Sequence, residues 1–221
     1  MTEENKKLIN SRSRVQNFGE VFTSKKEVKN MINMFEQEIV RPESRFLEPA
    51  CGDGNFLDEI LNEKLKSIIE KNKKNQFDFE KYSILAISSL YGVDIIEENI
   101  FQTRKRLEKT LLKYFDKSFQ SINDDYLKSI RYILKKNIIF GDALTLTFSD
   151  KKKNPIIFSE WSFVDSTNIK RRDFSFKHLI ETRPFEGHNL FSDLGEKAFI
   201  PEPKKEHPIC HYLKLHETKN S

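Results

Sequence analysis

Apolar residues recur at the spacing of an amphipathic helix in several segments of the chain. These segments cover residues 25–40, 54–68, 79–89, 97–115 and 124–134. Three short apolar runs, at residues 46–48, 91–94 and 137–140, have the length and composition of strands. Segment 79–89 also fits one continuous buried strand, because a short apolar run does not distinguish the two structures. Strands that alternate with helices predict an α/β fold with a mostly parallel sheet and helices on its faces.

The first predicted strand leads into a glycine turn and then into a helix. Glu48 ends this strand, and Gly52 and Gly54 follow it in the sequence Glu-Pro-Ala-Cys-Gly-Asp-Gly. Because glycine has no Cβ, such a turn can be tight and a ligand can approach its backbone closely. This order is typical of a nucleoside-cofactor site, in which Glu48 can accept hydrogen bonds from a cationic or hydroxylated ligand.

Acidic residues also end the other two predicted strands. Asp94 follows the second apolar run, and Asp142 follows the third. Ligands of parallel α/β sheets bind at the carboxyl ends of the strands. We therefore expect Glu48, Asp94 and Asp142 to meet around one pocket.

The length and charge of the chain limit its organisation and its partners. With 221 residues it is long enough for one substantial domain and an appendage, which we place at residues 1–165 and 166–221. Charged residues make up 33% of the chain, but its net charge is only +4. A strong nonspecific binder of polyanions is usually more basic, so this balance permits contact with nucleic acid without arguing for it.

The cysteines and histidines indicate neither a disulfide framework nor a metal site. Cys51 and Cys210 are the only cysteines, and His207, His211 and His216 show no paired ligand spacing with Cys210. The N-terminus lacks the apolar run of a secretion signal, and no stretch approaches the roughly 20 apolar residues that cross a bilayer. We expect a cytoplasmic protein without membrane contact.

Taken in order, these motifs resemble the S-adenosylmethionine-dependent DNA methyltransferases that modify the exocyclic amine of adenine in restriction-modification systems. The similarity rests on an aromatic-Thr segment at residues 22–23, the Glu-Pro-x-x-Gly-x-Gly turn that follows it, and the acidic ends at Asp94 and Asp142. It covers about the first two thirds of the chain. It implies a Rossmann-like fold with helices on both faces of the sheet, truncated at its C-terminal side.

The resemblance also implies the cofactor S-adenosyl-L-methionine and a set of residues that bind it. This set is Thr23, Glu48, Gly52, Gly54, Asp94, Ile95, Asp142 and Ala143. Glu48 and the glycine turn would face the methionine moiety, Asp94 the ribose hydroxyls, and Asp142 the adenine amine. Ile95 would lie against the adenine ring. Thr23 would close over the methionine part, although a Thr-Ser pair before a helix is also an ordinary N-cap.

The chain departs from the family in the motif that holds the base to be methylated. It lacks the Asn/Asp/Ser-Pro-Pro-Tyr/Phe tetrapeptide that holds a flipped target base in these enzymes. The nearest match, an Asn-Pro pair at residues 154–155, precedes an apolar run and so lies at the wrong end of a strand. In segment 159–164, Glu160 can accept from an amine and Trp161 can stack on a base. Alternatively this segment continues the strand and fills the core. No catalytic residue is assigned.

A basic cluster follows at Lys170, Arg171 and Arg172, interleaved with aromatic residues. It can contact DNA phosphates while rings contact bases, or it can be a solvated turn. The proline-rich segment beyond residue 183 predicts loops, and no target-recognition domain is apparent.

Three functions fit this sequence. The first is an adenine-specific DNA methyltransferase, in which a partner subunit supplies target recognition or the catalytic loop. The second is a catalytically silent cofactor-binding subunit of such an enzyme, which the missing tetrapeptide favours. The third is a methyltransferase for RNA or a small molecule, whose amine-binding loop has a different sequence.

Overall fold

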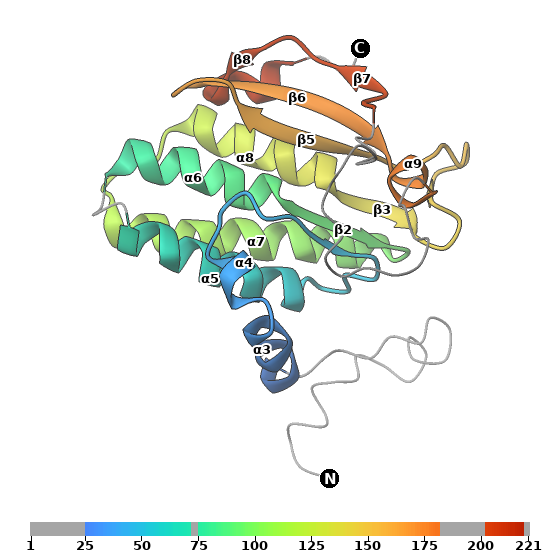
Figure 1. Cartoon of the computed structure of the whole chain (residues 1–221), viewed down its shortest axis with the longest axis horizontal. Helices are drawn as coiled ribbons and strands as arrows, with labels where there is room; N and C mark the ends of the chain where they lie inside the picture. Colours follow the sequence, from blue (N-terminus) through green and yellow to red (C-terminus); the bar gives the residue numbers. More distant parts are fainter. Residues whose placement is uncertain (1–24, 72–74, 182–201, 219–221) are drawn as a thin grey trace, which may run out of the picture.

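A computed structural model describes residues 25–71, 75–181 and 202–218 (Figure 1). Its elements are α3 (Lys25–Asn33), α4 (Glu36–Ile39), β1 (Phe46–Glu48), α5 (Asn55–Lys71), α6 (Gln76–Ser88), β2 (Leu90–Asp94), α7 (Glu97–Ser118), α8 (Asp124–Asn137), β3 (Ile138–Asp142), β4 (Thr147–Phe148), β5 (Ile157–Phe163), β6 (Asn168–Ser175), α9 (Phe176–Glu181), β7 (Lys205–Glu206), β8 (Cys210–His211) and the 3-10 helix η1 (Tyr212–Glu217). Thr23 and its aromatic neighbour lie outside these ranges.

The first sheet confirms the α/β class. Its described strands lie in the order β1-β2-β3-β4, with β1, β2 and β3 parallel and β4 antiparallel to β3. The sheet is therefore mixed. Glu48 pairs with Gly92, and Asp94 pairs with Phe140, so the acidic end of each parallel strand reaches the same edge.

One face of this sheet packs against another strand rather than a layer of helices. Tyr91, Val93 and Ile139 form a buried cluster with apolar side chains of the β5 region and α9. The ring of Phe158 lies 5.2 Å from that of Tyr91 and 5.0 Å from that of Phe176, both in edge-to-face contact. The family resemblance implied helices on both faces of the sheet. On this face, β5 and the first residue of α9 cover the sheet instead.

A second sheet is built on β6. β5 pairs antiparallel with β6 over its whole length, and β7 and β8 pair with other parts of β6. The segment expected to form loops thus contains strands in its described part. The expected boundary at residues 165 and 166 falls in the loop between β5 and β6. Trp161 is buried in β5, with its ring 6.0 Å from that of Tyr132 on α8, which confirms the strand interpretation of this segment.

The predicted helices are present, with different limits. The helices predicted at 97–115 and 124–134 extend further as α7 and α8, and segment 79–89 is the helix α6 rather than a strand. The helix predicted at 25–40 is interrupted between α3 and α4. No helix in the described ranges is both long and apolar enough to cross a membrane.

Lys64, on α5, fixes the loop that precedes β1. Its side chain is fully buried, and its Nζ donates to the carbonyl oxygens of Arg41, Pro42 and Ser44 at 3.0, 2.9 and 2.7 Å. The Ser89 hydroxyl oxygen also lies 3.0 Å from Nζ, so four oxygens surround the three N–H groups of this ammonium. Burial lowers the pKa of Lys64 to about 7. One helix thereby holds the entry to β1 and the entry to β2.

Candidate functional site

The three acidic strand ends lie at the same edge of the parallel strands, as the sequence predicts. Figure 1 shows β2 and β3 running side by side in the same direction, each followed by a turn at this edge. After β1 the chain crosses over the end of β2, where the Cys51 N–H donates to the Val93 carbonyl at 2.9 Å. The glycine turn therefore sits at the carboxyl end of β2 and beside Asp94.

The glycine turn needs its glycines for conformation and for packing. Gly52 and Gly54 have φ angles of 53° and 86°, which side chains rarely adopt. A Cβ on Gly54 would lie 2.8 Å from Cγ2 of Thr103, so the turn is pressed against α7. The Thr103 hydroxyl also donates to the Gly52 carbonyl at 2.9 Å.

Asp94 organises this turn. Its Oδ2 accepts the Gly52 N–H at 2.9 Å, and its Oδ1 accepts the Ile96 N–H at 2.8 Å and the Asn99 amide at 3.3 Å. Only 9% of the residue is exposed. The two oxygens of this carboxylate hold the turn and the start of α7 in place. The contact with ribose hydroxyls that the family resemblance implies stays a prediction.

A second contact from α7 secures the other side of the turn. Arg106 donates from Nε to the Asp53 carbonyl at 2.8 Å and from Nη1 to Oδ1 of Asn55 at 2.9 Å, and it forms an ion pair with the Asp53 carboxylate. Sequence reasoning missed both Arg106 and Thr103. They share one helix face with Asn99, at positions i, i+4 and i+7, but this spacing indicates a role only once the turn beside it is known.

Glu48 is the acid of this edge that is best suited to a cationic ligand. Its side chain is half-buried, and burial raises its pKa, an effect that a hydrogen bond from the Ala50 N–H opposes. None of the described residues supplies a cation to pair with it. A partly desolvated carboxylate beside a glycine turn gains from a positively charged ligand, which would replace the water lost on burial.

The other predicted contacts lie at the ends of β2 and β3. Ile95 is 48% exposed and offers an apolar surface at the end of β2. Asp142 is half-exposed, and its Oδ1 accepts the N–H groups of Leu144 at 2.8 Å and Thr145 at 3.4 Å. The bond from Leu144 is the main reason why the pKa of Asp142 is lowered. Asp142 therefore caps its own turn, with Ala143 half-exposed within it.

The residues considered for an amine-binding loop lie in a strand. Glu160 forms ion pairs with Arg45 at 3.1 Å and Arg172 at 3.3 Å. Trp161 is only 5% exposed, so its ring is not available to stack on a base. Segment 159–164 thus does not form a catalytic loop at the glycine turn.

The predicted basic cluster is divided between the two faces of β6. Arg171 is buried and forms an ion pair with Asp173 at 2.7 Å. Lys170 pairs with Glu206 at 2.7 Å, and Arg172 pairs with Glu160. Because adjacent residues of a strand point to opposite faces, the three cations do not form one basic surface.

His207 belongs to this buried network rather than to a metal site. Its Nε2 lies 2.9 Å from the Asp173 carboxylate. Over the described ranges, no group of three or more His, Cys, Asp or Glu side chains is arranged to hold a metal ion.

Comparison of the chain with protein-family models, with curated proteins and with solved structures finds no match in any of the three. The function is therefore inferred from the residues and their arrangement.

Proposed function

We propose that this chain is an S-adenosylmethionine-binding domain with a Rossmann-like fold, related to the adenine-specific DNA methyltransferases. The observation that carries this proposal is the Glu48 carboxylate, half-buried beside a glycine turn and without a cationic partner in the described residues. Asp94 and Asp142 end the neighbouring strands at the same edge.

The residues of this edge suit the chemical groups of the cofactor. Glu48 would accept from the ammonium of the methionine part, and the backbone of Gly52 would approach the same part closely. Ile95 would lie against the adenine. Asp94 would contribute by fixing the turn. Thr23, which lies outside the described residues, would contact the methionine part.

Methyl transfer requires an in-line attack on the cofactor. Bound S-adenosylmethionine would supply an electrophilic methyl group: its transfer to a substrate nitrogen would leave the sulfur neutral, and the proton lost by the nitrogen would pass to water. The protein contributes mainly by holding the two reactants in line and by excluding water. The order of the sequence motifs favours adenine in DNA as the substrate.

A catalytically silent subunit is the second candidate. It is favoured because residues 159–163 lie in β5, which pairs with β6, and because the family tetrapeptide is missing from the chain. A partner subunit would then supply the catalytic loop and the recognition of the target.

Tritiated S-adenosylmethionine distinguishes these alternatives. The purified chain is incubated with the labelled cofactor and, in separate reactions, with DNA, RNA or a cell extract. Label in DNA supports the enzyme, whereas binding without transfer to any substrate supports the silent subunit. A chain that does not bind the cofactor would refute both proposals.

A further inference from the structure

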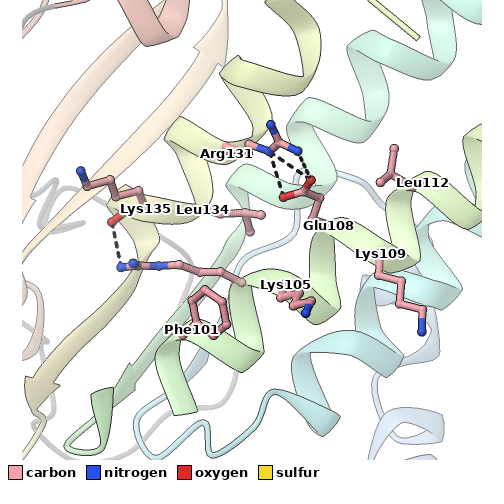
Figure 2. Close-up of a pocket in the computed structure, with 9 residues that line it drawn as sticks. Phe101, Lys105, Glu108, Lys109, Leu112, Arg131, Leu134 and Lys135 are labelled. Carbon is pink, nitrogen blue, oxygen red and sulfur yellow. Dashed lines mark hydrogen bonds and ion pairs between the residues drawn. The ribbon is translucent and has the colours of Figure 1, made fainter. Parts of the chain in front are cut away.

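A groove with a volume of about 520 Å³ opens between α7 and α8 (Figure 2). Its lining residues are Phe101, Arg104, Lys105, Glu108, Lys109, Leu112, Arg131, Leu134 and Lys135. The residues from α7 recur every three or four positions, so they form one stripe along this helix. The groove is therefore a continuous surface shared by two packed helices.

The floor of the groove is apolar. Leu134 is buried between the helices, and Leu112 is half-buried on the far side of Glu108 (Figure 2). Phe101 stands at one end with 58% of its surface exposed. The aliphatic stems of the surrounding lysines and arginines extend this apolar surface, because such side chains keep only their charged ends in water.

Positive charge surrounds this floor. Arg131 is bound by Glu108, the acid of the groove, through contacts of 2.6 to 3.1 Å. Arg104 donates to the carbonyl oxygen of Ile138 at 3.0 Å. Three other cations of the groove, Lys105, Lys109 and Lys135, form no ion pair with any described residue. The exposed rim therefore carries cationic charge that the described fold does not neutralise.

We propose that this groove binds an acidic amphipathic helix of a partner protein. A helix laid along a groove places apolar side chains at i, i+3, i+4 and i+7 on the floor, and acidic side chains beside them reach the rim. Leu112, Leu134 and Phe101 would receive the apolar side chains. Lys105 and Lys109 would meet the acidic ones.

A protein helix suits the groove better than a nucleic acid does. The floor offers leucine side chains, which have no hydrogen-bonding groups for sugar hydroxyls or base edges. An apolar floor with a charged rim is instead the usual arrangement of a surface that binds a protein.

The groove and the glycine turn share α7 but use different faces of it. Thr103 and Arg106 hold the turn, whereas Phe101 and Lys105 line the groove. A partner helix in the groove would thus lie beside the proposed cofactor site without covering it. Binding of such a helix can be measured without the cofactor, so it does not depend on the proposed function.

The test uses the full chain and synthetic peptides of about four helical turns. The probe is a fluorescein-labelled peptide with leucine at i, i+4, i+7 and i+11 and glutamate beside these positions. A second peptide has the same composition in scrambled order, and a short labelled DNA duplex serves as the nucleic-acid probe. Fluorescence anisotropy measures the affinity of each probe at several salt concentrations.

We expect the amphipathic peptide to bind, and its affinity should fall as the salt concentration rises. The double variant Lys105→Glu/Lys109→Glu should bind it at least tenfold more weakly than the wild type does. Phe101→Ala should also weaken it. The matched control, Lys113→Glu/Lys117→Glu, reverses two exposed charges of α7 outside the groove and should leave the affinity unchanged. Thermal melting shows whether each variant is folded.

Three results would overturn the proposal. In the first, the amphipathic peptide does not bind, or binds no better than the scrambled one. In the second, the control variant loses as much affinity as the groove variant. In the third, the DNA duplex binds more tightly than the peptide and loses its affinity in the groove variant.

Discussion

Replacing Asp94 by asparagine tests how the glycine turn is held. The substitution keeps the shape of the side chain but changes one acceptor oxygen into an amide that donates. In the structure, the two oxygens accept the N–H groups of Gly52 and Ile96 at 2.9 and 2.8 Å. Asparagine can accept only one of them, so the other N–H will face a donor in a buried environment.

The expected loss follows from these contacts. Hydrogen bonds to a charged group contribute about 1.5 to 3 kcal/mol, and a buried donor without an acceptor costs about 1 to 3 kcal/mol. The two effects overlap in a site that can relax, so the free energy of unfolding should fall by about 2 to 3 kcal/mol. Because the turn then loses its fixed position, the affinity for S-adenosylmethionine should fall about ten- to a hundredfold.

Urea denaturation and calorimetric titration measure these two quantities. Asp116→Asn is the matched control, because Asp116 is an exposed acid on α7 away from the turn. It should change neither stability nor affinity. An Asp94→Asn variant with unchanged stability would show that the turn does not depend on this carboxylate. Unchanged affinity in a folded variant would remove Asp94 from the cofactor site.

Further substitutions test other parts of the fold. Lys64→Met should lower the free energy of unfolding by about 2 to 4 kcal/mol in urea, since it leaves carbonyl oxygens of the loop before β1 without a donor. Burial lowers the pKa of Lys64, so the unfolded chain binds more protons than the folded one from about pH 7 toward pH 10.5. The free energy of unfolding should therefore rise with pH in that range more steeply in the wild type than in Lys64→Met. Equal dependence on pH in the two proteins would contradict this. Gly54→Ala should cost about 1 to 3 kcal/mol, because of its positive φ and its contact with Thr103, and Thr103→Ser should recover part of that loss in a double-mutant cycle. Asp173→Asn should lower the free energy of unfolding by about 3 to 5 kcal/mol, because Arg171 would keep a buried charge without its partner. A melting temperature close to that of the wild type would argue against this.

The first sheet could be predicted because its signals are local. Each parallel strand is a short apolar run, and each lies next to a helix with clear apolar spacing. The turn after β1 needs positive φ at Gly52 and Gly54, and glycine is the residue that tolerates this best. The edge of the sheet with its acidic ends follows from these elements, since parallel strands place their carboxyl ends together.

The second sheet was not predicted, because its buried face carries charge. Alternate residues of β6 are buried, and two of these positions hold Arg171 and Asp173. Burial alone would raise the pKa of Asp173, but hydrogen bonds from Arg171, Ser159 and His207 lower it. An ion pair at positions where strands usually carry apolar residues hides the alternation that identifies a strand. The same pattern resembled a basic cluster suited to phosphate.

The support of the glycine turn was missed for a different reason. The Thr103 hydroxyl reaches the Gly52 carbonyl across 51 residues of sequence, and Arg106 reaches Asp53 across 53. Such contacts depend on how α7 packs against α5, which no local pattern specifies. Polar residues on one helix face are common on solvated surfaces, so their spacing indicates a role only once the turn beside them is known.

Calorimetric titration of the purified chain with S-adenosylmethionine tests the central claim most directly. The account predicts saturable binding with one site per chain, weakened by Glu48→Gln, which removes the charge of the carboxylate beside the glycine turn. Glu59→Gln, on α5 outside the proposed site, should bind as the wild type does. Absence of binding by the folded chain, or equal binding by the Glu48→Gln variant, would contradict the account.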